Sequence, residues 1–183
     1  MIIPVLIIAA VVVLDQISKY IVLTNMQVGD SFNLIKYILN ITYTTNPGAS
    51  FGMLKDHRWV FMVLSVIALI LMAAAIVYLG QKKLKGNTFI RIALAVMLGG
   101  GLANMIDRII RKEVVDFLEF AFVRFAIFNV ADSFICIGSV LFCICIFTGK
   151  YSLFEKSDKT EELQETEEKP EESEEINSDG TEN

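Results

Sequence analysis

The chain has 183 residues, of which 54% are hydrophobic, and its mean hydropathy is +0.55. This apolar share exceeds that of ordinary soluble domains and predicts a membrane protein. The net charge of −5 hides two parts, because residues 1–150 carry a net charge of +5 and residues 151–183 one of −10. Three cysteines and one histidine, His57, supply neither a disulfide framework nor a zinc site.

Four long apolar segments predict a bundle of four transmembrane helices. A span of about 20 residues crosses the roughly 30 Å of hydrocarbon in a bilayer. The first segment does not resemble a signal peptide, because it lacks a leading positive charge and its apolar run continues past Asp15. The predicted spans are residues 3–24, 59–79, 88–110 and 129–149.

The longer connecting segments are polar and mixed in character. Within the loop 25–58, the run 33–44 (NLIKYILNITYT) is rich in β-branched and aromatic residues and predicts one or two short strands on the membrane surface. Asn46-Pro47-Gly48 is a turn signal, and residues 49–56 can then form a short helix. The other mixed loop is 111–128. We expect a small β-containing region outside the bundle.

Charge predicts the orientation and sets the tail apart. The short loop 80–88 contains three lysines and no acid, so the positive-inside rule places it in the cytoplasm. Four spans then put both termini in the cytoplasm and the loops 25–58 and 111–128 outside. The tail, within 151–183, is dense in glutamate and is expected to be disordered, with no inferred role.

Polar residues from three predicted helices converge in depth. With the helical rise of 1.5 Å per residue, Asp15 and Lys19 lie roughly 17 and 23 Å above the cytoplasmic edge. Asn104, Asp107 and Asp132 lie at roughly 20, 24 and 27 Å on the same scale. Polar groups within a bilayer are costly, so this convergence in the outer third predicts a functional pocket. Asp15 and Lys19, four residues apart, can equally form a structural ion pair.

Spacing within the helices supports the same grouping. Asn104 and Arg108 are four residues apart and share one helix face. Asn129 stands three residues before Asp132 at a predicted helix start, where asparagine is a favourable N-cap. Asn129 can therefore serve as a cap, as a pocket residue, or as both. Gly99–Gly101 most simply allows close approach of neighbouring helices.

Serine and zinc hydrolysis have little support in the sequence. Gly48–Gly52 matches G-x-S-x-G around Ser50, but that motif requires a strand-to-helix elbow and a histidine base. The single histidine, His57, lies in the same loop. A dyad of Lys19 with a serine lacks a well-placed serine, and the zinc protease motif H-E-x-x-H is absent.

Aspartate chemistry fits better. Asp132 is predicted in the first turn of the last span, and Asp116, in the loop after the third span, is predicted at the same membrane face. Two close carboxylates share one proton, and the helix N-terminus favours the anionic form of Asp132, leaving Asp116 to carry the proton. Arg108, Asn104 and Asn129 can fix a peptide and stabilise an oxyanion. A proton-coupled transporter also uses intramembrane acids and stays open at this point, although no internal repeat is visible.

Five sequence patches, taken in order, resemble bacterial lipoprotein signal peptidase, also called signal peptidase II. Any one patch would be weak, whereas five in order with suitable spacing are specific, and they extend over most of the predicted bundle. The patches are Asp15–Lys19, Asn46–Gly52, Gly99–Arg108, Val114–Phe117 and Phe128–Asp132.

The resemblance implies an aspartic endopeptidase of the bacterial cytoplasmic membrane, with its active site at the extracytoplasmic face. It would remove signal peptides from diacylglyceryl-modified prolipoproteins by cleaving just before the lipidated cysteine. The resemblance also implies inhibition by globomycin. It implies no metal, cofactor or nucleic-acid partner, and nothing in the sequence requires more than a monomer. The catalytic positions of the family fall on Asp116 and Asp132, and Asp107 is expected to be structural. The pocket positions fall on Asp15, Lys19, Asn46, Gly48, Asn104, Arg108 and Asn129.

Overall fold

The computed structural model describes residues 2–47, 58–81 and 87–148, all within one compact unit, Met1–Tyr151. The predictions for the helix 49–56 and for the acidic tail lie outside the described residues, as do those for Gly48, Ser50 and His57.

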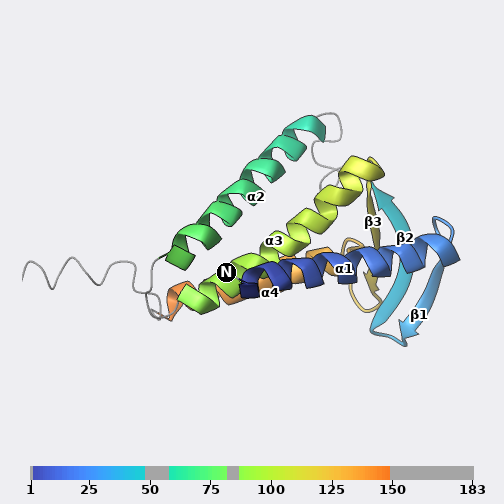
Figure 1. Ribbon diagram of the computed structural model, residues 1–183. Helices are drawn as coiled ribbons and strands as arrows, with labels where there is room; N and C mark the ends of the chain where they lie inside the picture. The colour runs from blue at the N-terminus through green and yellow to red at the C-terminus, as the bar shows by residue number, and fades with distance from the viewer. Residues whose placement is uncertain (1, 48–57, 82–86, 149–183) are drawn as a thin grey trace, which may run out of the picture. The chain divides into compact units, whose positions relative to one another are not determined.

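Four helices form the body of the molecule (Figure 1). Each is long and apolar enough to cross a membrane, which confirms the predicted membrane fold. Their bounds differ from the predicted spans by at most two residues. They are α1 (Ile2–Asn25), α2 (Arg58–Gln81), α3 (Asn87–Ile110) and α4 (Val130–Phe147).

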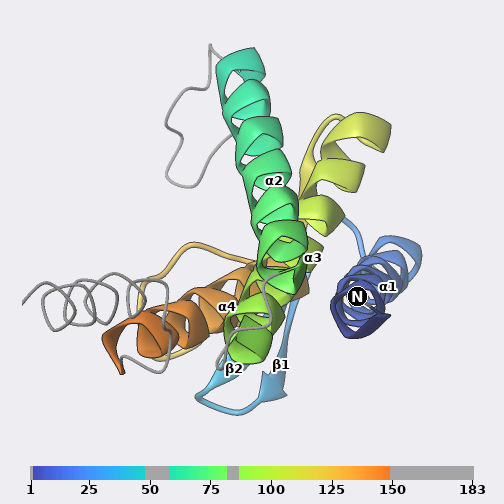
Figure 2. The same cartoon turned by 60° about the vertical axis from the view of Figure 1, so that its left-hand side comes forward.

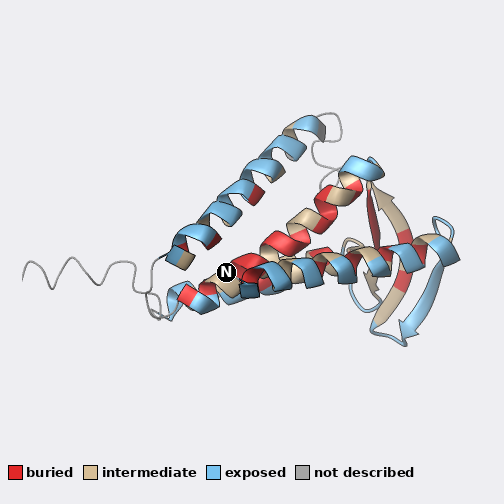
Figure 3. Ribbon diagram, in the orientation of Figure 1, coloured by how far each residue is buried: buried red, intermediate tan, exposed pale blue. Residues whose placement is uncertain are grey.

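Helix α3 is the central helix, since it packs against each of the other three. In Figure 2, α1 and α4 lie on either side of it. It is also the most buried helix, whereas α2 and α4 expose most of their apolar side chains (Figure 3). That exposure suits helices whose outer faces meet lipid rather than water.

Three successive glycines let α3 approach all its neighbours. Successive helix residues point about 100° apart, so Gly99–Gly101 faces three directions. A Cβ on the first glycine would lie 2.8 Å from the Cβ of Val11 in α1. On the second it would lie 2.5 Å from the carbonyl oxygen of Ala131 in α4, and on the third 2.6 Å from Leu69 in α2. Any larger residue here would force the helices apart or displace a side chain.

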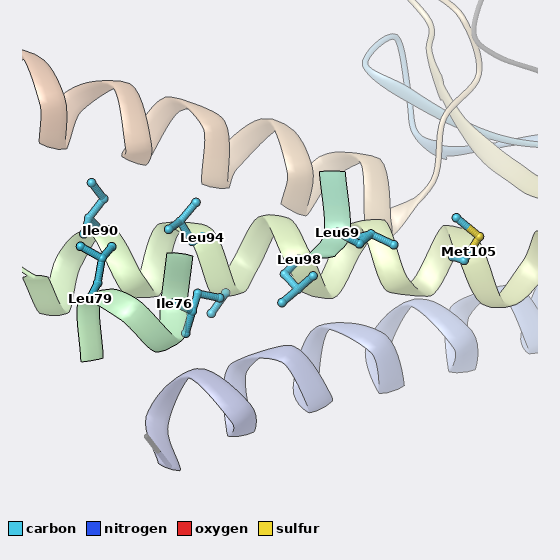
Figure 4. Packing of buried hydrophobic residues seen from close by; sticks show 8 residues of the cluster. Leu69, Ile76, Leu79, Ile90, Leu94, Leu98 and Met105 are labelled. Carbon is cyan, nitrogen blue, oxygen red and sulfur yellow. The ribbon is translucent and has the colours of Figure 1, made fainter. Parts of the chain in front are cut away.

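A cluster of large aliphatic side chains joins α2 to α3 (Figure 4). These side chains interdigitate along the two helices, and each is at most 9% exposed. The labelled members are Leu69, Ile76, Leu79, Ile90, Leu94, Leu98 and Met105.

A three-stranded antiparallel sheet lies at one end of α1, with its strands crossing the direction of that helix (Figure 1). Its order is β1 (Ser31–Ile35), β2 (Leu39–Asn46) and β3 (Val114–Phe120). The strands predicted within 33–44 are present as β1 and β2. No strand was predicted at a particular position within the mixed loop 111–128, where β3 forms by pairing with β2 about seventy residues earlier.

A second, smaller core attaches the sheet to the bundle. Val22 of α1 packs against Ile41 and Tyr43 of β2 and against Val115 and Phe117 of β3, and all five are at most 9% exposed. Asp116 lies between the last two residues. The sheet is therefore held where β3 presents this carboxyl group to the helix ends.

Candidate active site

Several polar side chains are buried where α1, α3 and α4 meet the sheet. Burial of polar groups at this density is expensive unless each is hydrogen-bonded or paired. Each is at most 5% exposed: Asp15, Lys19, Asn104, Asp107, Asp116 and Asn129. The depth argument from the sequence correctly brought together the members that lie on α1 and α3.

Asp116, in the middle of β3, is held by two asparagine side chains. Its Oδ1 accepts a hydrogen bond from Nδ2 of Asn129 at 2.7 Å. Its Oδ2 accepts one from Nδ2 of Asn46, at the end of β2, at 3.1 Å. Antiparallel pairing of Asn46 with Val114 and of Thr44 with Asp116 brings these groups together. Both carboxyl oxygens are therefore fixed in place.

Asp132, in the first turn of α4, is fixed by the helix start itself. Asn129 is the N-cap, and its side chain accepts the Asp132 backbone N–H at 2.9 Å. The Asp132 Oδ2 accepts the Asn129 backbone N–H at 3.2 Å, which completes a capping box. The Oδ1 of Asp132 accepts from Nδ2 of Asn104 at 2.7 Å. Asn129 is thus the N-cap of α4, and its side-chain Nδ2 also donates to Asp116.

A continuous chain of amides connects the two carboxyl groups. Nδ2 of Asn129 also approaches Oδ1 of Asn104 at 3.1 Å. The order is then Asp116, Asn129, Asn104, Asp132. Since every oxygen of both carboxyl groups accepts an N–H, the pair is held by neutral donors rather than by a direct ion pair.

The environment of Asp116 favours its protonated form. The pKa of Asp116 is raised from 3.8 to about 6, mainly by burial and then by the nearby negative charge of Asp132. Hydrogen bonds from Asn46 and Asn129 and the charge of Lys19 oppose this rise. A carboxyl group near its pKa at neutral pH, beside a second carboxyl group, suits acid–base catalysis.

Lys19 is the centre of a buried ion cluster. Its Nζ lies 2.8 Å from Oδ2 of Asp15 and 2.8 Å from Oδ2 of Asp107, and all three side chains are inaccessible to solvent. Nζ also donates to Oδ1 of Asn104 at 3.0 Å. That bond fixes the Asn104 amide with its oxygen toward the cation and its Nδ2 toward Asp132. Asp15 and Lys19 are therefore an ion pair that also supports the site.

Asp107 connects this cluster to the sheet. Besides Lys19, it pairs with Arg111 and accepts a hydrogen bond from Gln16 at 3.0 Å. Its Oδ2 lies 3.4 Å from the backbone N–H of Val115, next to Asp116. Gln16 lies within the sequence patch Asp15–Lys19, but neither Gln16 nor Arg111 was predicted to be a site residue. The four-residue spacing of Arg111 from Asp107 was the signal available.

Arg108 is the most exposed of the predicted cationic groups at this site. Its side chain is partly exposed, and its Nη1 donates to the backbone oxygen of Asn104 at 3.2 Å. The charges of Asp132 and Asp116 both act on its guanidinium. Arg108 therefore lies beside the carboxyl pair while remaining accessible to a bound peptide.

Among the described residues, no group of three or more histidine, cysteine or acidic side chains could hold a metal ion.

Comparison with known proteins identifies the family. The family described as Signal peptidase (SPase) II matches residues 7–148. The chain belongs to this family. It is 41% identical to a lipoprotein signal peptidase of Shouchella clausii (strain KSM-K16), over 74% of this chain and 87% of that protein. It is 40% identical to one of Staphylococcus aureus (strain JH9), over 85% and 94%.

Solved structures agree with the family assignment. A bacterial membrane enzyme determined at 2.3 Å resolution by the in meso method is 38% identical, with a TM-score of 0.71. The match covers 84% of this chain and 93% of that one.

With its four apolar helices, the chain is a multi-pass bacterial membrane protein. Membership of a peptidase family also decides between hydrolysis and proton-coupled transport in favour of hydrolysis.

Proposed function

We propose that Asp116 and Asp132 perform the catalysis of this enzyme, an aspartic peptidase that removes signal peptides from prolipoproteins. The observation that carries the proposal is the chain of amides that joins the two carboxyl groups and fixes all four of their oxygens. Such preorganisation keeps both groups oriented while leaving their protons mobile.

The two carboxyl groups divide the chemistry of peptide hydrolysis. The ionised group, Asp132, takes a proton from a water molecule, whose oxygen then attacks the scissile carbonyl carbon. The protonated group, Asp116, donates its proton to the carbonyl oxygen. When the tetrahedral intermediate breaks down, the C–N bond is cleaved and the leaving nitrogen receives the proton from Asp132. One hydroxyl group of the intermediate returns a proton to Asp116, which restores the starting state of the pair. Because the two groups are coupled, they titrate jointly rather than as independent sites.

The remaining pocket residues act on the pair or on the peptide. Asn46, Asn104 and Asn129 hold the carboxyl oxygens, so their proposed role is orientation of the catalytic groups. Arg108, being partly exposed beside the pair, is proposed to bind the peptide or the developing oxyanion. Lys19, with Asp15, holds Asn104. Gly48 is proposed as a pocket position from the sequence resemblance alone.

The substrate is proposed to be a diacylglyceryl-modified prolipoprotein, cleaved just before its lipidated cysteine. Its signal peptide is a membrane helix and its acyl chains stay in the outer leaflet, so the scissile bond is presented at the outer interface. We place the site at that face, with both termini in the cytoplasm. We further propose that the enzyme acts as a monomer and that globomycin-type inhibitors occupy the substrate groove.

Replacement of each acid tests the catalytic proposal. General acid–base groups contribute about 10²–10⁴-fold to rate, so Asp116→Asn and Asp132→Asn should each lower processing by at least about 10²-fold. Immunoblotting should show accumulation of uncleaved, diacylated prolipoprotein. Ser50→Ala and His57→Ala are matched controls and should process normally. Near-normal processing by either asparagine variant, while correctly folded, would refute the assignment.

A further inference from the structure

Arg111 lies in the turn between α3 and β3, just beyond the last residue of the helix. Its guanidinium pairs with Oδ1 of Asp107, one turn earlier, and donates to Oε1 of Gln16 in α1 at 3.3 Å. Gln16 in turn donates to the same Oδ1 of Asp107 at 3.0 Å. The side chain of Arg111 is 26% exposed, whereas that of Asp107 is inaccessible to solvent. Arg111 thus reaches from the surface to a buried carboxylate of the site.

The buried ion cluster lacks one positive charge without Arg111. Lys19 is shared between Asp15 and Asp107, and all three side chains are inaccessible to solvent. Two carboxylates and one ammonium group leave one negative charge without a cation, which is costly away from water. Arg111 supplies the second cation, and it does so on the oxygen of Asp107 that Lys19 does not contact.

Arg108, the other arginine near this end of α3, is directed mainly to the carboxyl pair. The charges of Asp132 and Asp116 act on its guanidinium more strongly than the charge of Asp107 does. Balance of the Asp107 charge therefore falls to Lys19 and Arg111.

The contacts of Asp107 hold its carboxylate in one orientation. Oδ1 accepts from Arg111 and Gln16, whereas Oδ2 lies 2.8 Å from Nζ of Lys19 and 3.4 Å from the backbone nitrogen of Val115. The two oxygens of a carboxylate are chemically equivalent, so the partners of Oδ1 decide where Oδ2 points. Loss of the Arg111 guanidinium removes the charged partner of Oδ1 and allows the group to turn.

One route from Asp107 to the carboxyl pair runs through Lys19. Its Nζ contacts Oδ2 of Asp107 and donates to Oδ1 of Asn104 at 3.0 Å. Nδ2 of Asn104 then donates to Oδ1 of Asp132 at 2.7 Å. A shift of Asp107 is therefore passed on to the amide that holds Asp132.

The other route runs along β3. This strand lies at the edge of the sheet, so part of its backbone binds partners outside the sheet. Asp107 accepts the N–H of Val115, and the backbone oxygen of Phe128 accepts the N–H of Phe117 at 2.9 Å. Asp116 lies between these two anchored residues, and Asp107 provides the first anchor.

We propose that Arg111 is a positioning residue for the catalytic pair. By balancing and orienting Asp107, it keeps Asn104 on Asp132 and holds the start of β3, which carries Asp116. It acts without contacting the substrate. The inference rests on the proposed catalytic role of the two acids.

Cleavage kinetics of a synthetic diacylated prolipoprotein peptide test this inference on enzyme from a monodisperse detergent fraction. Misplacement of a catalytic group by about 1 Å can cost about 10²-fold, and Gln16 and Lys19 still hold Asp107, so Arg111→Gln should lower kcat about tenfold. The KM should change little. Arg111→Lys keeps a cation four residues from Asp107 and should restore most of the lost kcat. Arg124→Gln is the matched control, because it removes the same charge from an exposed position after β3 and should cleave like the wild type.

Other results would overturn the role of Arg111. A lower Tm for Arg111→Gln with unchanged kcat would mean that this residue only stabilises the fold. A higher KM at constant kcat would make it a substrate-binding residue, and equal activity of Arg111→Lys and Arg111→Gln would exclude a role for its charge.

The catalytic proposal is tested separately in the same assay. If Asp116→Asn and Asp132→Asn are inactive while Arg111→Gln cleaves normally, only the role of Arg111 fails. Normal cleavage by either asparagine variant would instead refute the catalytic pair itself.

Discussion

At the scale of single residues, the two proposed catalytic acids differ in how the fold holds them. Asp116 is buried on a strand and accepts hydrogen bonds from side-chain amides alone. Asp132 is partly exposed in the first turn of a helix, where one of its oxygens accepts a backbone N–H. The helix start favours an anion at Asp132, whereas burial favours a neutral group at Asp116. Environment thus assigns different roles to identical side chains.

The alkaline side of the pH profile should report the loss of the proton that the coupled pair carries, held mainly at Asp116. Its raised pKa of about 6 means that the acid form is lost as the pH rises through this value, so kcat/KM should fall on the alkaline side. The hydrogen bond from Asn46 lowers this pKa, because it stabilises the carboxylate. Asn46→Ala should therefore move the alkaline limb to higher pH.

Asn40→Ala is the control for that experiment. Asn40 lies on the same strand but approaches Glu119 rather than Asp116, so its removal should leave the limb in place. Cleavage of a lipidated peptide across a pH series gives both profiles. An unchanged limb in Asn46→Ala, or a shift to lower pH, would contradict the proposed role of Asp116.

Lys19 should matter for stability as well as for the site. It is buried between Asp15 and Asp107, and removal of one partner from a buried ion cluster typically costs about 3–5 kcal/mol. Lys19→Met keeps the length of the side chain but leaves two buried carboxylates without their shared cation. Thermal unfolding in detergent should show a large decrease in Tm for Lys19→Met. Lys36→Met, at an exposed position, should unfold at the same temperature as the wild type. Equal stability of both variants would contradict the role given to the cluster.

Much of this site could be predicted from the sequence because helices convert residue number into depth. Asp15, Lys19, Asn104 and Asp107 were brought together in this way, since each helix has a fixed rise. The hydrogen-bond partners of these side chains could not be predicted from depth along the helices. Which oxygen of Asp116 receives the Asn129 amide depends on how β3 sits against the start of α4, and no local pattern records that contact.

At the scale of elements, the glycine triplet in α3 controls where α4 begins. A Cβ on Gly100 would meet the backbone oxygen of Ala131, the residue before Asp132. A Cβ on Gly101 would instead meet the flexible end of Leu69. Backbone cannot move aside as a side chain can, so only the first substitution must displace α4 together with its carboxyl group.

This difference gives a paired prediction. Gly100→Ala should reduce processing at least tenfold, because displacements of about 1 Å at a catalytic group can cost about 10²-fold in rate. Gly101→Ala should retain near-normal processing. The two variants differ by one helix position and add the same methyl group, so each serves as the control for the other. Comparable activity in both would show that α4 is not positioned through Gly100.

The elements also show where sequence patterns stop being informative. The four helices were predictable because each is a long apolar run, and their bounds follow from the length needed to cross a bilayer. Strand β3 could not be predicted from the sequence, because the segment VVDFLEF is short and carries two acids. Its strand geometry comes from the pairing of Thr44 with Asp116 and of Leu39 with Phe120, which is a tertiary contact.

At the scale of the whole molecule, the two ends of the helix bundle differ in the polar and charged residues that they carry. The sheet and the carboxyl pair lie at one end of the bundle, and the starts of α1 and α3 lie at the other (Figure 1). The short lysine-rich loop 80–88 joins α2 to α3 at that second end. Retention of such a loop in the cytoplasm would put the carboxyl pair at the outer face, where we propose that the substrate is cleaved.

Cysteine accessibility in intact spheroplasts tests this orientation. Cys136, Cys143 and Cys145 would first be replaced by serine, and the resulting chain must still process its substrate. Ser31→Cys, at an exposed position of β1, should then react with a membrane-impermeant maleimide in intact spheroplasts. Ser157→Cys, in the tail, should react only after permeabilisation, because it follows an even number of spans from a cytoplasmic N-terminus. The reverse pattern would place the active site in the cytoplasm and overturn the proposed topology.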